Sequence, residues 1–232
     1  MYKVKILTLF PDMFPGPLGH SITGRGLTDK LWSVDAVDIR QFAKDKHKTA
    51  DDAPYGGGAG LVMKPELIAE SIKLAKKDLP NAKVVYLTPS GEQFNQEKAI
   101  EFASFKDGLI IICGHYEGID QRIIDLYVDY EVSVGDYVLT GGEIACYPFL
   151  DSILRNIEGV LGNKETLHEE SFENNLLEHP HYTRPVEFEG IEVPEVLRSG
   201  NHGKIAQWRL EKAIEKTKKV RPDLYKKYLG KS

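Results

Sequence analysis

The sequence predicts an α/β protein in which helices cover both faces of a parallel sheet, followed by a small, mostly helical C-terminal domain. Short apolar runs alternate along the chain with segments of helical periodicity. The apolar runs are nearly continuous, as expected for strands that are buried on both faces. After Ile157 the composition becomes polar and acidic, which indicates that a separate region follows.

Five segments have the apolar character of strands, and helical segments alternate with them. The predicted strands are residues 4–10, 34–42, 84–87, 109–113 and 130–134. The predicted helices are residues 65–77, 95–105, 143–157 and 201–220. We expect Asn95 to cap the second of these helices, because an asparagine side chain accepts hydrogen bonds from the free backbone N–H groups of a first turn.

These elements divide the chain into three predicted parts. Residues 1–158 form the sheet domain, residues 159–175 a mobile linker, and residues 176–232 the helical domain. The 232 residues are 41% hydrophobic, enough for one ordinary core and a smaller one. No apolar run approaches the ~18 residues of a membrane span. The start of the chain lacks a signal-peptide pattern, and we expect a cytoplasmic protein with reduced cysteines.

Charge is distributed unevenly along the chain. Residues 200–232 hold ten Lys and Arg residues against three acids, a net charge of +7, so the rest of the chain carries −12. Arg209, Lys212, Lys216 and Lys219 recur at helical spacing and form one predicted face, here called the basic stripe. A basic segment of this kind indicates binding to a polyanion, although a solvated helix face is the alternative.

Three loops that follow predicted strands indicate a ligand site. They are residues 87–91, 113–118 and 134–143, and each contains glycine, which permits close approach of the backbone. Open α/β sheets bind ligands at the carboxyl edge, where such loops meet. A further run, Gly56–Gly60, does not fit G-x-G-x-x-G, and no G-x-x-x-x-G-K-[ST] occurs. The sequence therefore does not indicate a dinucleotide or ATP site.

Other motifs are spread over almost the whole chain: Leu9–Phe14, Asp51–Gly60, Pro180–Pro185 and Leu197–His202. Together with the three loops, they resemble the bacterial tRNA (guanine-N1)-methyltransferases of the SPOUT class. The resemblance implies a deep trefoil knot within residues 87–157 and a homodimer packed across it. It also implies S-adenosylmethionine as cofactor, and methylation of N1 of guanosine 37, just 3′ of the anticodon, in tRNA.

The resemblance also implies which residues contact the ligands. It assigns to the cofactor Leu87, Pro89, Gly91, Gly114, Tyr116, Glu117, Gly118, Val134, Gly135, Tyr137, Leu139, Gly141 and Gly142. It assigns to the tRNA His47, Asp51, Pro54, Tyr55, Gly56, Gly57 and Gly58, and we expect the basic stripe to contact phosphates. From the residues alone, Tyr137 and Leu139 could equally belong to the core.

Methylation of N1 requires a general base for the N1 proton and a donor to the negative charge that develops on O6. The resemblance assigns the second role to Arg155, which by sequence alone is an ordinary surface residue of a helix. It assigns the first to Glu170, at a position where the family typically has aspartate. Glu169 is the competing candidate, and both acids could simply be solvated. A second departure from the family is Ala145, where proline is usual.

The sequence does not predict a metal centre or a partner other than tRNA and a second copy. His179 and His181 lack further ligands at zinc spacing, so any Mg²⁺ dependence would come from the resemblance and from the RNA. Neither DNA nor a membrane is expected as a partner. Two other functions stay open: a ribose 2′-O-methyltransferase of the same fold class, and a non-catalytic tRNA-binding relative.

Overall fold

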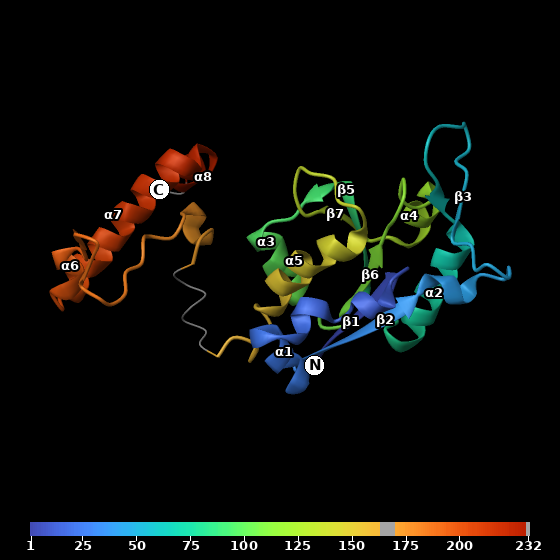
Figure 1. Ribbon diagram of the computed structural model, residues 1–232, viewed down its shortest axis with the longest axis horizontal. Coiled ribbons are helices and arrows are strands. Elements are labelled where there is room, and N and C mark those ends of the chain that lie inside the picture. Colours follow the sequence, from blue (N-terminus) through green and yellow to red (C-terminus); the bar gives the residue numbers. More distant parts are fainter. Residues whose placement is uncertain (163–169, 231–232) are drawn as a thin grey trace. The chain divides into compact units, whose positions relative to one another are not determined.

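The computed structural model describes residues 1–162 and 170–230, and the chain divides into two compact units at Gly162 (Figure 1). The first unit, Met1–Gly162, contains the sheet, and the second, Asn163–Ser232, is mostly helical. The predicted linker, residues 159–175, spans this division. Its residues 163–169, which include the alternative base Glu169, lie outside the described residues.

The first unit is built on a five-stranded sheet in which each strand pairing is parallel. The strands are β1 (Tyr2–Thr8), β2 (Trp32–Asp38), β5 (Lys83–Gln93), β6 (Leu109–Cys113) and β7 (Tyr130–Ser133). Their order is β2-β1-β6-β5-β7. The predicted parallel sheet is confirmed. The carboxyl ends of β5, β6 and β7 lie side by side, because these three strands are adjacent and share one direction.

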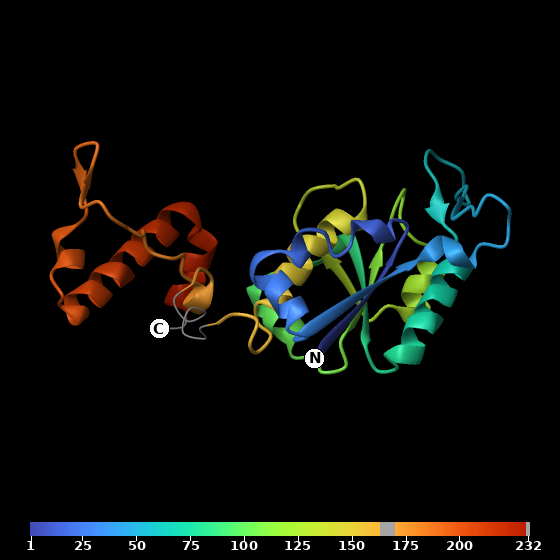
Figure 2. The same cartoon turned by 60° about the horizontal axis from the view of Figure 1, so that its bottom comes forward.

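Helices cover both faces of this sheet (Figure 2). One face packs against α1 (Ser21–Thr28), α3 (Gln96–Ala103) and α5 (Gly142–Leu154), and the other against α2 (Pro65–Asp78) and α4 (Gln121–Tyr127). Side chains alternate along a strand, so β6 directs Ile111 to the first face and Ile110 and Ile112 to the second. This double burial explains why its sequence is apolar throughout.

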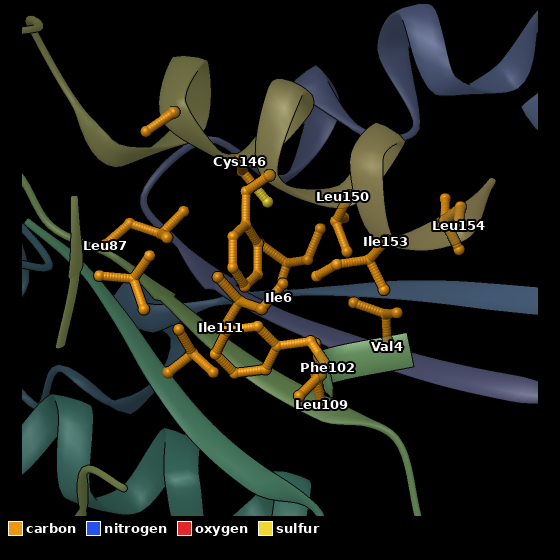
Figure 3. Packing of buried hydrophobic residues seen from close by; sticks show 14 of the residues in the cluster. Val4, Ile6, Leu87, Phe102, Leu109, Ile111, Cys146, Leu150, Ile153 and Leu154 are labelled. Carbon is orange, nitrogen blue, oxygen red and sulfur yellow. The ribbon is translucent and has the colours of Figure 1, made fainter. Parts of the chain in front are cut away.

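The core on the α5 side is centred on aromatic and branched side chains (Figure 3). Phe102 of α3 is fully buried and packs edge-on against Phe149 of α5, with ring centroids 5.3 Å apart. Ile6 of β1 and Ile153 of α5 complete the contact between sheet and helix. Removal of a ring of this kind costs about 3–5 kcal/mol, so this core holds α5, and therefore its first turn, firmly on the sheet.

Several predicted boundaries need correction. The second strand ends at Asp38 rather than Phe42, because the Asp38 carboxylate accepts a hydrogen bond from Arg40 N at 2.9 Å and begins a short helix, η3 (Ile39–Phe42). β5 continues through the predicted loop to Gln93, with a register shift between Leu87 and Glu92. The expected cap is present: Asn95 Oδ1 accepts from Lys98 N at 2.9 Å.

Short elements complete the two units. The first contains η1 (Pro11–Met13), η2 (Gly16–Gly19) and the hairpin of β3 (Asp51–Asp52) and β4 (Val62–Met63). The second contains η5 (Glu173–Asn175), the hairpin of β8 (Glu187–Phe188) and β9 (Ile191–Glu192), α6 (Glu195–Arg198), α7 (His202–Val220) and α8 (Pro222–Leu229). The helical character of the C-terminal region is confirmed, and the trefoil knot stays a prediction. Within the described ranges, no helix is long and apolar enough to cross a membrane.

Candidate functional site

The carboxyl ends of β5, β6 and β7 surround one cavity of about 310 Å³, a size at the lower end of the range typical of small-molecule sites. Its lining comes from residues 86–90, 114–118 and 132–142, without residue 136, together with Ala145. These segments contain the predicted cofactor residues apart from Gly91. The structure thus brings together three loops that lie far apart in the sequence.

Gly91 has a different place from the one the sequence suggests. It lies in β5 beyond the register shift and does not line the cavity. A Cβ atom at this position would be 2.4 Å from the backbone nitrogen of Val132 in β7. Gly91 therefore allows β5 and β7 to approach closely, which stabilises the wall of the site, and its contact with a cofactor stays a prediction.

The second and third loops are joined directly to each other. Gly142 N, at the start of α5, donates a hydrogen bond to Gly114 O at 2.8 Å. A Cβ on Gly142 would be 2.7 Å from Cys113 Cα, closer than real Cβ contacts come. Glycine is required here for close approach, and the contact keeps the first turn of α5 against the loop that follows β6.

A buried carboxylate, Glu143, lies directly behind the cavity. Glu143 is only 1% exposed. One carboxylate oxygen accepts from the Thr8 hydroxyl at 2.5 Å, and the other is 2.5 Å from His115 Nε2. His115 lines the cavity, so this hydrogen-bonded chain links the end of β1 and the first turn of α5 to the ligand-facing loop. The positive end of the α5 dipole favours a carboxylate at this position.

Sequence reasoning did not identify Glu143, Thr8 or His115. Thr8 and Glu143 are 135 residues apart, and their contact depends on the fold. A single acid followed by the apolar segment Ile144–Cys146 was the one sequence feature that could have indicated a buried polar network.

The β3–β4 hairpin, which carries several predicted tRNA residues, is hydrogen-bonded to the edge of the site. Glu117 N donates to Leu61 O at 2.9 Å, and Met63 N donates to Gly118 O at 3.0 Å. Burial and the nearby Asp51 carboxylate raise the pKa of Tyr116. The base of the hairpin is therefore fixed beside the cavity.

The tip of the same hairpin is open to solvent. Tyr55 is fully exposed, and Cβ atoms added to Gly56, Gly57 or Gly58 would meet no atom within 4 Å. Pro54 precedes them at the turn and is half-buried. His47 is also exposed, in a turn where its backbone N–H donates to Asp45 Oδ1 at 3.0 Å. These residues form a projecting surface next to the cavity rather than part of its wall.

The two predicted catalytic residues do not lie in the cavity wall. Arg155 is the C-cap of α5, whereas the cavity contacts the first turn of that helix. The helix has 13 residues, which corresponds to a length of roughly 20 Å. An arginine side chain does not span this distance, so Arg155 does not reach the cavity of its own chain. Glu170 belongs to the second unit.

The basic stripe lies along α7, and its members differ in their surroundings. Lys212 pairs with Glu215 at 2.7 Å. Lys216 Nζ donates to the backbone oxygen of Glu178 at 3.2 Å. Arg209 is half-buried, whereas Lys219 is exposed. Lys212 is thus paired within α7 itself, whereas Lys216 bonds to the backbone of a segment outside the helix.

No metal centre is visible in the part of the chain that the structure describes, since it holds no group of three or more His, Cys, Asp and Glu side chains arranged around one point. His179 and His181 stack with ring centroids 4.5 Å apart, and His181 pairs with Glu178 at 2.8 Å. Cys113 is fully buried in the core, and this burial raises the pKa of its thiol.

A parallel sheet with a cavity between glycine-containing loops at its carboxyl edge is typical of α/β proteins that bind a small ligand there. Comparison with known proteins identifies the family. The family described as "tRNA (Guanine-1)-methyltransferase TrmD" matches residues 2–227. This chain belongs to that family, a member of the SPOUT class, which confirms the resemblance.

Individual relatives agree with the family match. The chain is 52% identical to the tRNA (guanine-N(1)-)-methyltransferase of Clostridium tetani, over 98% of this chain and 93% of the relative. It is 54% identical to the protein of the same name from Clostridium beijerinckii, over 97% and 92%. It is 50% identical to that of Rhodospirillum rubrum, over 98% and 94%. The similarity therefore covers both units.

Proposed function

We propose that this protein transfers a methyl group from S-adenosylmethionine to N1 of guanosine 37, just 3′ of the anticodon, in tRNA. One observation carries the proposal: three loops converge on a single cavity, in a chain about half identical to proteins named for tRNA guanine-N1 methylation. The near-complete coverage of those relatives supports the same activity, because it includes both units.

The residues of the cavity fit an adenosine-bearing methyl donor. Tyr86 and Val132 are buried and supply an apolar floor. The main chain around Leu87 and Leu139 supplies N–H and C=O groups for the edges of a base, and Glu117 supplies a carboxylate for amino or hydroxyl groups. When bound, S-adenosylmethionine supplies an electrophilic methyl group.

The chemical step on guanine then needs the two residues outside the cavity. Glu170 accepts the proton of N1, which leaves the ring nitrogen nucleophilic. Arg155 donates to O6, where negative charge develops as the proton leaves. Ribose methylation would not need the carboxylate of Glu170, so that residue separates the main proposal from its closest alternative.

A second copy of the chain explains how Arg155 can act. Because Arg155 lies roughly 15 Å along α5 from Ala145, the last residue of this helix in the cavity wall, we propose a homodimer in which each cavity receives Arg155 from the other copy. Mixed dimers test this. A copy carrying Arg155→Ala and a copy carrying Glu117→Ala, each inactive alone, should recover activity at one of the two sites when combined. Absence of recovery would contradict the shared site.

We propose that tRNA binds across both units, in the cytoplasm. Lys212 and Lys219 of the basic stripe on α7 contact phosphates and release counterions, while the exposed hairpin tip at Tyr55 lies near the target base. Guanine must leave its stack before N1 can react. Any Mg²⁺ dependence would come from the RNA, because metal ions are common partners of its phosphates.

Product analysis tests the proposal. The full chain is incubated with S-adenosylmethionine and a tRNA transcript that has guanosine at positions 36 and 37, and the RNA is digested to nucleosides. The proposal predicts 1-methylguanosine from position 37 and none from a transcript with adenosine there. A 2′-O-methylated ribose would indicate the alternative enzyme, and tRNA that is bound but unmodified would indicate a non-catalytic relative.

A further inference from the structure

The residues that follow Glu170 form a compact turn, here called the clip (residues 171–178). Phe172 N donates to Leu176 O at 2.7 Å, and Glu178 N donates to Ser171 Oγ at 3.1 Å. Phe172 and Asn174 adopt positive φ angles, 80° and 50°, which turn the chain back on itself. Glu170 directly precedes this turn, so the position of its backbone depends on the position of the clip.

A buried threonine of α7 attaches the clip to the helix. Thr217 is 0% exposed. Its hydroxyl accepts a hydrogen bond from Leu177 N at 2.8 Å and donates one to Ala213 O at 2.7 Å. On the neighbouring position, Lys216 Nζ donates to Glu178 O at 3.2 Å. Two adjacent residues of α7 thus hold two adjacent residues of the clip, and η5 lies against α8.

The contact at Thr217 is more than the common bond between a helical threonine and its own helix. Threonine side chains often bond only to the carbonyl four residues earlier, as Thr28 does with Gly24 O at 3.0 Å. Thr217 makes that bond and also accepts from Leu177, 40 residues away in the sequence. Loss of its hydroxyl would therefore leave the Leu177 N–H without this acceptor.

We propose that Thr217 is a positioning residue for methyl transfer: by fixing the clip on α7, it sets where Glu170 presents its carboxylate. The inference rests on the proposed function, which makes Glu170 the base. It gives α7 two roles, since Lys212 and Lys219 contact tRNA while Thr217 and Lys216 hold the clip. The tRNA-contacting lysines and the clip are attached to the same helix. Binding of α7 to the tRNA phosphates therefore also places the Glu170 carboxylate.

The test compares Thr217→Val, which keeps the shape but removes the hydroxyl, with Thr217→Ser, which keeps it. Thr28→Val is the matched control. The measurements are the single-turnover rate, tRNA affinity and hydrogen exchange of the Leu177 amide in the full chain. Thr217→Val should slow methyl transfer about 5- to 30-fold, as loss of about 1–2 kcal/mol implies. Leu177 should exchange faster, with tRNA affinity nearly unchanged, and Thr217→Ser should resemble the wild type.

A second variant keeps the test valid if Thr217→Val fails to fold. Ser171→Ala opens the clip without changing α7, and it should also slow methyl transfer at nearly unchanged tRNA affinity. Ser199→Ala, which removes a similar bond from Asn201 N at 3.2 Å elsewhere in the same unit, is its control. An equal loss of rate and tRNA affinity in Thr217→Val would overturn the inference, because it would indicate general damage to α7.

Glu170→Gln, measured alongside, separates the role of Glu170 as the base from the role of Thr217 in positioning it. A slow Glu170→Gln with Thr217→Val and Ser171→Ala at the wild-type rate would overturn the positioning role alone. A wild-type rate for Glu170→Gln would overturn the base assignment, and the positioning role with it. A slow Glu170→Gln together with slow Thr217→Val and slow Ser171→Ala would support both.

Discussion

Replacement of Glu143 by alanine tests the buried hydrogen-bonded chain behind the cavity. The change removes the acceptor of the Thr8 hydroxyl and the partner of His115 Nε2, each 2.5 Å from the carboxylate. Thr8 is fully buried, so its hydroxyl proton cannot turn to water. His115 is only partly buried, with a side chain 17% exposed, and can rehydrate.

The size of the effect follows from these surroundings. A buried polar group left without a partner costs about 1–3 kcal/mol, and the vacated space adds to it, so we expect a loss of about 2–4 kcal/mol. For a chain of this length, the melting temperature falls by roughly 2–4 °C for each kcal/mol. Glu143→Ala should therefore melt roughly 5–15 °C below the wild type. Glu143→Gln keeps the shape and an acceptor for Thr8, and should lose about 1 kcal/mol or less.

Circular dichroism melting and calorimetric titration with S-adenosylmethionine measure the two consequences. Because His115 lines the cavity, Glu143→Ala should also weaken cofactor affinity, measured below the melting range. Glu97→Ala is the matched control, since Glu97 lies in the first turn of α3 and is exposed. If Glu143→Ala had the same melting temperature and cofactor affinity as Glu97→Ala, the hydrogen bonds that Glu143 makes with Thr8 and His115 would have no role in stabilising the site.

Three further outcomes are expected. Arg155→Ala should slow the chemical step by about 10²–10³-fold without loss of cofactor affinity. Arg155→Lys should not restore the rate, since the planar guanidinium group is lost. A normal single-turnover rate for Arg155→Ala would mean that this residue has no role in the reaction. Reversal of Lys212 and Lys219 to Glu should weaken tRNA binding and flatten its salt dependence, and an unchanged salt slope would make the stripe a solvated face. Arg221 lowers the pKa of Asp223 to about 2. Any stabilisation from this pair is therefore present above the ordinary pKa of ~3.9 and is lost as pH falls through about 2. In NMR titrations of the Asp223 carboxyl, Arg221→Gln should raise the midpoint, and an unchanged midpoint would contradict the pairing.

The sheet and the convergence of its loops were predictable from the sequence because both depend on local patterns. Continuous apolar runs such as Leu109–Cys113 indicate strands buried on two faces, and parallel strands necessarily bring their following loops to one edge. The N-cap of α3 was similarly local: Asn95 Oδ1 accepts from Lys98 N at 2.9 Å.

What the sequence did not indicate depends on contacts between distant residues. Glu143 acquires its partners only when β1, β6 and α5 pack together, so no window of the sequence contains them. Gly91 resembles a loop glycine, yet its requirement comes from the backbone of β7. The sequence also did not indicate α1, whose glycines Gly24 and Gly26 are poor helix formers, or α4, which has only 7 residues. The attachment of the clip to α7 joins Leu177 and Thr217, which are 40 residues apart in the sequence.

In the proposed mechanism, a carboxylate at position 170 removes the N1 proton of guanosine 37 while S-adenosylmethionine supplies the methyl group. Single-turnover formation of 1-methylguanosine by the wild type, Glu170→Asp and Glu170→Gln tests it most directly. Glu170→Gln should be slower by about 10²–10⁴-fold with cofactor affinity intact, and Glu170→Asp should keep substantial activity. A Glu170→Gln variant that forms 1-methylguanosine at the wild-type rate would contradict the claim.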